Sequence, residues 1–379
     1  MSLSHIMNPI PADWALATTH IASEYVCRQF CANIGVLPKV LPPPELNVVL
    51  LMACSTLTRT LADAYCNPVT INLDMVRYSE ALQMQEKGLK PGREEFLLAR
   101  YPPDCEIILE RPAVVLDKFG LIVLWYLPGA IDDAIQNNML VATMMMSSLL
   151  GKSIARSSAN NTWCTHQSNF QPSENGLTPG CINLSPAWFL QGLPAPQFHP
   201  EVSAALKSDD APSLCWAIRR LATLVAAALR VMHSGLYWSS LTTQMGLGVW
   251  ADARQLEKMG NCLRGWASVF TVLTVMCNWY SPLHRDALSR AQWFDIMTSV
   301  GGYAPARMKM PNIGIEIAYN TGVMAGTSGR IVRHGVDRVN SDRVVWIWYM
   351  RDDVHQFIDV PRGDYSQYKS VVTNALYYT

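Results

Sequence analysis

The chain has 379 residues, half of them hydrophobic, and its 30 Lys and Arg residues balance 30 Asp and Glu residues. This length allows one large domain or two ordinary ones with a sizeable core. The zero net charge gives no sign of general nucleic-acid binding, and no apolar run is long enough to span a bilayer. The ten cysteines include no CxxC pair, which argues against a zinc site. With no signal peptide visible, they predict a reducing, intracellular compartment.

The first part of the chain is predicted to be mainly helical. Helices are expected at residues 13–36, 45–66 and 73–87, followed by a connection at 89–104. Residues 106–131 change character, because two apolar runs flank a turn at residues 117–120. This pattern predicts a β-hairpin that is buried on both faces. A Met-rich helix is expected to follow at residues 132–150.

The second part of the chain mixes loops, helices and strands. Residues 151–200 are loop-rich, and because long loops are often functional, they are expected to cover a substrate cleft. Two helices are then expected at residues 203–233, a helix at 252–266 and a strand at 269–277. The last elements are expected to be a short helix at 292–300 and strands at 313–319, 330–336 and 343–350.

These strands indicate how the core is built. About five or six strands are expected after residue 268, which is too few for an eight-stranded jelly roll. The hairpin is therefore expected to supply the missing strands. The fold class is predicted to be α+β, with residues 7–379 forming one domain. Its parts are a helical N-terminal part (7–105), the hairpin (106–130), the loop-rich cover (151–200) and the jelly-roll core (268–351).

Three residues have the pattern of a metal site. His284 and Asp286 form a His-x-Asp pair, and His334 follows 50 residues after His284. On an extended backbone, residues i and i+2 share a face, so both side chains of the pair can reach one metal while Arg285 points away. Two histidines and one carboxylate are the ligands of non-haem Fe(II) oxygenases and leave positions open. These three residues are the predicted catalytic metal ligands.

A basic residue follows the second histidine at a useful distance. Arg343 lies nine residues beyond His334, and residues 340–342 have the composition of a turn. We expect this turn to join two strands into a hairpin that returns Arg343 to the metal. A 2-oxoglutarate co-substrate would chelate iron with its keto acid end. Its far carboxylate would then be bound by the planar fork of Arg through two hydrogen bonds.

Each of these residues also has a simpler interpretation when taken alone. His284 and Asp286 could belong to a solvated surface turn, His334 could be a core histidine, and Arg343 could be a charge at a hairpin edge. Their order and spacing together favour the iron site. Residues 254–343 also contain 11 Lys or Arg against 6 Asp or Glu. Such a basic part suits phosphate contacts, although an ordinary solvated surface would look the same.

Four blocks of the sequence resemble a known family. They are RPAVVLD (111–117) with YLPGA (126–130), SPAWF (185–189), NWYSPLHRD (278–286) and the segment 326–351. Together they extend over residues 106–351, about two thirds of the chain. The chain resembles the fungal branch of the TET/JBP family, the Fe(II)/2-oxoglutarate-dependent dioxygenases that oxidise methyl groups on DNA bases.

The resemblance implies a double-stranded β-helix, or jelly-roll, core that holds Fe(II) and 2-oxoglutarate and consumes O2. His284, Asp286 and His334 match the metal positions of the family, and Arg343 matches its 2-oxoglutarate clamp. The resemblance also implies that Asn278 makes a polar contact to the co-substrate.

Two positions depart from the family pattern. This chain has Trp279 where the family commonly has Arg, and Val345 where it often has a hydroxyl residue. Both departures concern the finer co-substrate contacts, and the expected metal ligands are intact.

The resemblance further implies the reaction. The expected substrate is a methylated base flipped out of double-stranded DNA, chiefly 5-methylcytosine, which is oxidised to 5-hydroxymethylcytosine and beyond. Nuclear residence follows from this implication, and neither a membrane nor a protein partner is expected. The alternative is an Fe(II)/2-oxoglutarate oxygenase of RNA, protein or a small molecule, which the zero net charge slightly favours. A non-catalytic binding module is disfavoured by the intact ligand set.

Asp337, three residues after His334, is the expected substrate-binding residue. An ionised carboxylate only accepts hydrogen bonds, and the exocyclic amines of cytosine and adenine donate them. A compact Asp also leaves room for a purine, so N6-methyladenine demethylation is a further expectation. The simpler interpretation is a turn carboxylate that caps the loop towards Arg343.

Overall fold

The computed structural model describes residues 10–84, 92–104, 106–160, 165–190, 192–193, 195–303 and 305–377. Its first helices follow the expected order, as α1 (Ala15–Asn33), α2 (Val48–Tyr65) and α3 (Met75–Met84). The connection expected at residues 89–104 is wrong, because α4 (Arg93–Arg100) forms there. Helix α4 is short and four of its eight residues are charged, so its sequence resembles that of a solvated connection.

The described strands form two sheets. The larger sheet has eight strands in the order β1 (Pro68–Thr70), β3 (Ala113–Leu116), β4 (Ile122–Leu127), β11 (Val323–Thr327), β8 (Asp295–Gly301), β13 (Arg343–Tyr349), β6 (Val272–Cys277) and β5 (Gly180–Leu184). The smaller sheet has five strands in the order β2 (Ile107–Leu109), β10 (Ile315–Ala318), β9 (Arg307–Met310), β12 (His334–Val336) and β7 (Ser281–His284). The chain is therefore a mixed α and β protein, as expected.

The expected hairpin is present as β3 and β4, which pair antiparallel. Every residue of both strands is buried. β4 also pairs with β11, which joins the hairpin to the large sheet. The two faces of this hairpin pack against different parts of the protein. Val115 and Tyr126 point into an apolar cluster between the two sheets. Val114 and Trp125 belong to a second cluster, which is formed with the helices.

The strand count expected after residue 268 is wrong, because eight strands, β6 to β13, follow that position. The helix expected at residues 292–300 is strand β8, which lies between β11 and β13. All residues of β8 except the last are buried. Burial on both faces removes the alternation of polar and apolar residues that marks a strand. The hairpin therefore extends the large sheet and does not replace core strands.

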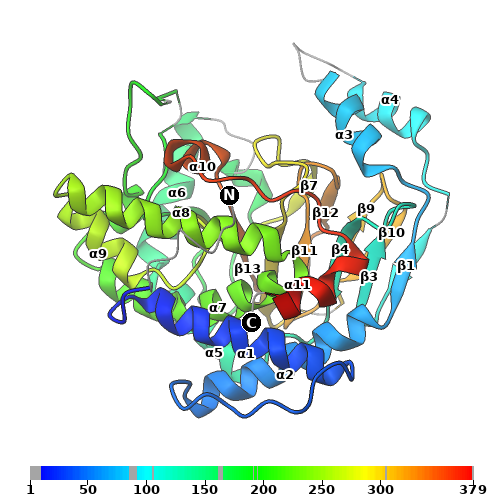
Figure 1. Cartoon of the computed structure of the whole chain (residues 1–379). Helices are drawn as coiled ribbons and strands as arrows, with labels where there is room; N and C mark the ends of the chain where they lie inside the picture. Colours follow the sequence, from blue (N-terminus) through cyan, green and yellow to red (C-terminus); the bar gives the residue numbers. More distant parts are fainter. Residues whose placement is uncertain are drawn as a thin grey trace.

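Two buried apolar clusters hold these layers together. One lies between the sheets and includes Met297 and Val345 from the large sheet with Met308 and Ile317 from the small one. The other lies on the opposite face of the large sheet, under a layer of helices (Figure 1). Those helices are α1 and α2 with α5 (Asp133–Met145), α7 (Ala211–Met232), α8 (Ser234–Ala253) and α9 (Glu257–Gly265).

The helical layer differs from expectation in two places. The two helices expected at residues 203–233 are one long helix, α7, preceded by a short 3-10 turn at Ala204–Leu206. Helix α8 was not expected, because its Ser, Thr and Gly residues favour helices weakly. Packing supplies its stability instead, since α8 contacts α7 and α9 and eleven of its residues are buried.

The tract at residues 151–200 is less irregular than expected. Helix α6 (Ser147–Asn160) extends into it, and β5 forms an edge of the large sheet. Its middle part lies against the approach to β7, where the N–H of Tyr280 donates to the carbonyl of Asn169 at 2.6 Å. The N–H of Gln171 donates to the carbonyl of Asn278 at 2.9 Å. This part of the tract thus lies beside the expected metal strand.

The C-terminal tail packs back on the core. After α10 (Asp352–Ile358), the chain ends in α11 (Val371–Tyr377). The hydroxyl of Tyr368 donates to the carbonyl of Tyr65 at 2.6 Å, and the two rings stack with centroids 4.6 Å apart. Tyr378 lies outside the described residues. Among the helices that the structure describes, none combines the length and apolarity needed to cross a membrane.

Candidate metal centre

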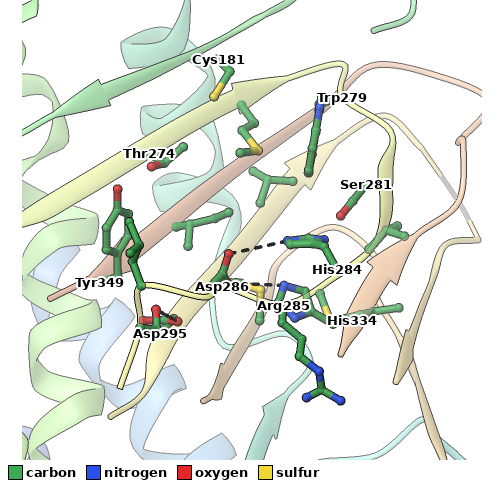
Figure 2. A pocket seen from close by; sticks show the side chains of 18 of the residues that line it. Cys181, Thr274, Trp279, Ser281, His284, Arg285, Asp286, Asp295, His334 and Tyr349 are labelled. Carbon is green, nitrogen blue, oxygen red and sulfur yellow. Dashed lines mark hydrogen bonds and ion pairs between the residues drawn. The ribbon is translucent and has the colours of Figure 1, made fainter. Parts of the chain in front are cut away.

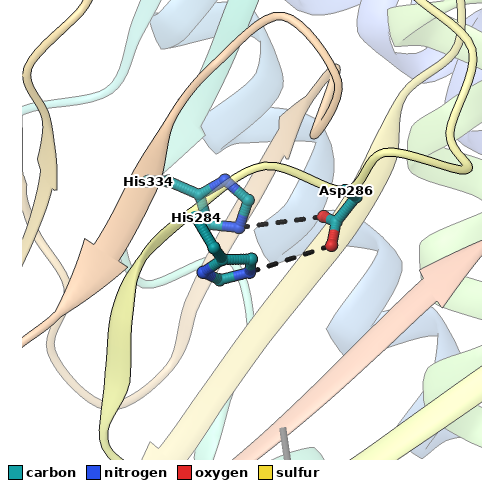
Figure 3. Close-up of side chains that lie close together, drawn as sticks. All are labelled: His284, Asp286 and His334. Carbon is teal, nitrogen blue, oxygen red and sulfur yellow. Dashed lines mark ion pairs between the residues drawn. The ribbon is translucent and has the colours of Figure 1, made fainter. Parts of the chain in front are cut away.

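His284, Asp286 and His334 come together at one edge of the small sheet (Figure 3). His284 ends β7, His334 begins β12, and the two residues are direct partners in the antiparallel pairing of these strands. The carboxylate of Asp286 lies 3.8 Å from Nε2 of His284 and 3.9 Å from Nε2 of His334. One potential ligand atom from each residue lies within 4.8 Å of the others. A single metal ion can therefore contact all three residues.

The two imidazoles are oriented in the same way. Nδ1 of His284 lies 2.8 Å from the carbonyl oxygen of Pro282, and Nδ1 of His334 lies 3.0 Å from that of Val332. A carbonyl oxygen only accepts, so each Nδ1 carries the proton and each Nε2 keeps its lone pair. Burial, with the neighbouring His334 as the second cause, lowers the pKa of His284. Both effects leave Nε2 available as a metal ligand near neutral pH.

A second carboxylate lies next to Asp286. Asp295, at the start of β8, is buried, and its Oδ2 accepts a hydrogen bond of 2.9 Å from the hydroxyl of Ser289. Burial, followed by the charge of Asp286, raises the pKa of Asp295. Gly329 packs against both carboxylates. A Cβ at this position would collide with Oδ2 of Asp286 and lie 2.6 Å from Oδ2 of Asp295, so a larger residue would displace one of them.

Arg285, between the first two candidate ligands, points away from them as expected (Figure 2). Its guanidinium is buried and forms a salt bridge with Glu94 on α4, with an N–O distance of 3.0 Å. It also donates to the hydroxyl of Tyr78 on α3 at 2.5 Å and to the backbone carbonyl of Ile331. The loop that carries Asp286 is thereby tied to two N-terminal helices and to the segment that leads to His334.

The candidate ligands line a cavity of about 410 Å³ between the two sheets (Figure 2). One wall is the inward-facing row of β13, formed by Arg343, Val345, Ile347 and Tyr349. One end of the cavity is closed, since Arg343 is 2% exposed and Tyr319 is 1% exposed. The other end reaches the surface at Leu288, which is 79% exposed. The cavity thus has a buried end and an open end.

The buried end contains polar groups without partners. Nη2 of Arg343 donates to the carbonyl of Trp279 at 2.7 Å. Within the described part of the chain, Nε and Nη1 of Arg343 and the hydroxyl of Tyr319 have no hydrogen-bond partner. Burial lowers the pKa of Arg343. A buried guanidinium without an anion is costly, so these groups form a site for an anionic oxygen ligand.

The hairpin expected between His334 and Arg343 is wrong, because β12 belongs to the small sheet and β13 to the large one. Residues 340–342 carry the chain from one sheet to the other. Asp342 anchors this crossing, because its carboxylate accepts from Nδ2 of Asn278 at 2.6 Å and from the hydroxyl of Ser173 at 2.8 Å. Arg343 nevertheless reaches the cavity, because it faces inward from β13.

The two remaining predicted site residues do not line this cavity. Asn278 is buried and bonds Asp342, and its Oδ1 accepts from the N–H of Arg343 at 2.9 Å. It therefore positions the backbone of Arg343. Asp337 lies at the surface, with its side chain 63% exposed and 2.5 Å from Nζ of Lys309. Its contact with a substrate stays a prediction.

The donor set of the cavity fits an Fe(II) ion with 2-oxoglutarate. Two neutral imidazoles and one carboxylate suit Fe(II) and leave coordination positions for a chelating co-substrate. The unpartnered N–H groups of Arg343 suit the distal carboxylate of that co-substrate. Tyr319 offers a hydroxyl at the same closed end of the cavity. In the family pattern a hydroxyl residue often stands at the position of Val345, so Tyr319 could supply the missing group.

Several of these residues were missed by sequence reasoning. Tyr319 lies 24 positions before Arg343, and no local pattern connects the two. Glu94 and Arg285 are 191 residues apart. Gly329 had a usable signal, since a glycine close to a histidine ligand indicates a close approach of the backbone to another group.

Comparison with known proteins gave weak likenesses. No family model and no curated protein sequence matches this chain. NgTET1 in complex with 5mC DNA is 11% identical, covers 79% of this chain and 98% of its own, and has a TM-score of 0.39. An oxidoreductase of the 2OG-Fe(II) oxygenase family from Burkholderia pseudomallei is 13% identical, with coverage of 75% and 93% and a TM-score of 0.28. OsALKBH1 is 11% identical, with coverage of 64% and 99% and a TM-score of 0.29. At TM-scores below 0.5, these likenesses alone establish neither fold nor activity.

Proposed function

We propose that this chain is an Fe(II)- and 2-oxoglutarate-dependent dioxygenase with a double-stranded β-helix core. The observation that carries the proposal is the combination, in one cavity, of the His284–Asp286–His334 group with the buried guanidinium of Arg343. Two nitrogens of that guanidinium have no partner among the described residues. An anionic co-substrate that also chelates the metal accounts for both features.

The order of the strands supports the proposed core. Strands β6 to β13 divide into two sets of four, β11-β8-β13-β6 in the large sheet and β10-β9-β12-β7 in the small one. Eight strands in two facing sheets is the arrangement of a jelly roll. The hairpin and the N-terminal helices share the sheets and cores of these eight strands, which supports one domain over residues 7–379.

The residues of the cavity have distinct roles in this proposal. Bound Fe(II), with 2-oxoglutarate and O2, supplies the chemistry that hydroxylates a C–H bond. His284 and His334 present Nε2 to the ion because their Nδ1–H groups are held by backbone carbonyls. Asp286 supplies the carboxylate ligand. Arg343 and Tyr319 orient the co-substrate from the closed end, where both side chains are buried.

The proposed substrate is a methyl group on a DNA base, chiefly 5-methylcytosine, with N6-methyladenine as a second substrate. The sequence resemblance supports this choice, because its blocks coincide with parts of the core: 111–117 with β3, 278–286 with β7, and 326–351 with β12 and β13. A base must leave the stack to enter a cavity that opens at the surface. Nuclear residence is proposed on the sequence resemblance alone.

The test is to incubate the protein with Fe(II), 2-oxoglutarate and O2, with and without methylated duplex DNA. Succinate release and mass spectrometry of the digested nucleosides are measured together. We expect succinate release to rise with methylated DNA and 5-hydroxymethylcytosine to form. Succinate release that responds to methylated RNA, a peptide or a small molecule, and not to DNA, would keep the oxygenase and refute its substrate. A protein that binds neither Fe(II) nor 2-oxoglutarate would refute the oxygenase itself.

A further inference from the structure

A second concave site adjoins the metal centre. It is a groove of about 740 Å³ lined by Arg93 and Glu94 of α4, the segment 166–169, Arg333 and the end of β7. His284 and Arg285 line both this groove and the metal cavity. The groove and the cavity therefore meet at β7 and at a candidate metal ligand, whereas their other walls come from different elements.

The groove carries an excess of positive charge. Three guanidinium groups, from Arg93, Arg285 and Arg333, face the single carboxylate of Glu94. Arg285 takes up this carboxylate through hydrogen bonds of 3.0 to 3.2 Å. The contacts of the other two guanidinium groups with this carboxylate are longer. The N–O distance is 3.3 Å for Arg93 and 4.0 Å for Arg333. The groove thus keeps about two positive charges that are not neutralised by its own residues.

These two charges are accessible. The side chain of Arg93 is 29% exposed and that of Arg333 is 26% exposed, whereas that of Arg285 is 3% exposed. Arg338 adds a further positive charge beside the groove. Its Nη2 donates to the carbonyl of Ser168, a residue of the groove, at 2.7 Å. The guanidinium of Arg338 also lies over the ring of Tyr280, 5.9 Å from its centroid.

We infer that this groove binds the phosphodiester backbone of the nucleic-acid strand whose base enters the metal cavity, with Arg93 and Arg333 contacting phosphates. The inference rests on the proposed function. Guanidinium groups pair with phosphate oxygens through charge-assisted hydrogen bonds, and such contacts position a strand without reading its sequence. A strand held there would pass beside His284, so a base turned out of it would face the metal. A local basic groove also explains how a chain of zero net charge could bind DNA.

The test compares the parent protein with R93Q/R333Q in fluorescence anisotropy of a labelled, methylated duplex at several salt concentrations. Each lost phosphate contact should lower the slope of log affinity against log salt by about 1, and hence by about 2 for the double variant. We expect affinity to fall on the order of tenfold at low salt. R59Q/R254Q, which changes two exposed arginines outside the groove, is the matched control and should bind like the parent.

Because Arg333 precedes a metal-ligand candidate, R93Q alone is a second variant on a separate helix. Its expected loss of slope is about half that of the double variant. A parent-like slope and affinity in both R93Q and R93Q/R333Q would overturn the groove, and the proposed function would survive if the parent still oxidised methylated DNA. A parent protein that neither binds nor oxidises DNA would overturn both the groove and the DNA substrate.

Discussion

Glu94 holds the guanidinium of Arg285, the residue between His284 and Asp286, through three hydrogen bonds of 3.0 to 3.2 Å. Glu94 belongs to α4, in the helical N-terminal part, whereas Arg285 follows β7. The same guanidinium bonds the carbonyl groups of Arg330 and Ile331, just before His334. This ion pair thus fixes both chain segments that carry the candidate metal ligands.

The Glu94→Gln variant should lose iron affinity and stability together. Removing one partner of a buried pair leaves Arg285 charged and uncompensated, which should cost about 3 kcal/mol in the free energy of unfolding. Fe(II) titration and urea unfolding measure the two effects. Glu95→Gln, an exposed carboxylate on the same helix, is the matched control. If both variants behave alike, the ion pair does not support the metal centre.

Replacement of Gly329 by Ala should disturb the metal centre directly. The new Cβ would overlap Oδ2 of Asp286 and crowd Oδ2 of Asp295, so the ligand carboxylate must move. We expect Fe(II) affinity to fall by on the order of tenfold or more, because a misplaced ligand loses coordination geometry. Gly235→Ala is the control, since its Cβ would meet no atom closer than 3.8 Å. Parent-like iron binding by Gly329→Ala would show that Asp286 does not act from its present position.

Arg343→Met should separate stability from co-substrate binding. The variant removes a buried charge that lacks an anion, so the cofactor-free protein should gain about 1 kcal/mol or more in stability. Its affinity for 2-oxoglutarate should fall by about 2–5 kcal/mol, because the bidentate pair is lost. Calorimetric titration with 2-oxoglutarate and thermal melting of the same sample check both signs. A less stable variant with unchanged 2-oxoglutarate affinity would remove Arg343 from the co-substrate site.

Tyr319→Phe offers a milder change at the same closed end. It deletes only the buried hydroxyl, which has no partner among the described residues. We expect affinity for 2-oxoglutarate to fall roughly tenfold, as for the loss of one hydrogen bond to a charged group, with little change in stability. An unchanged affinity would leave Arg343 as the sole clamp in the cavity.

Acidification should destabilise the protein through His233. Burial lowers the pKa of His233 to about 4, whereas it titrates near 6.5 when unfolded. Its neutral ring accepts from the N–H of Leu236 at the start of α8 and donates to the carbonyl of Gln292. As the pH falls from about 6.5 to 4, the unfolded chain binds a proton that the folded chain does not, so stability drops by about 3 kcal/mol. His233→Asn should make the stability profile less steep in that window, and the remaining slope should come from the buried His284 and His355, whose pKa values burial also lowers to about 4. Parallel profiles for variant and parent would refute this assignment.

The three candidate metal ligands could be picked out from the sequence because two of them are two residues apart and the third lies in a short run of strand-forming residues; their metal binding stays a prediction. The co-substrate end was only partly predictable. Arg343 was found, but by way of a hairpin that does not exist, since β12 and β13 lie in different sheets. Turn-forming residues at positions 340–342 cannot distinguish a hairpin from a crossing between sheets, because both need the chain to reverse.

Buried strands and distant partners explain the remaining differences. β8 was expected to be a helix because central strands of a covered sheet lose their alternation. β11 has small residues at Ala325 and Gly326, which give no strand signal. The ion pair of Glu94 with Arg285 and the position of Tyr319 depend on tertiary packing, which a local pattern does not contain.

The closed end of the cavity imposes a sequence of events in time. We expect a molecule that binds at the buried Arg343 to enter from the side of the exposed Leu288 and to pass the candidate metal ligands. A base held at the metal would block that passage in both directions. In the proposed reaction, we therefore expect the co-substrate to enter first and succinate to leave last. Steady-state measurements should therefore show succinate competing with 2-oxoglutarate and not with DNA, and excess DNA should slow turnover by trapping succinate behind the substrate.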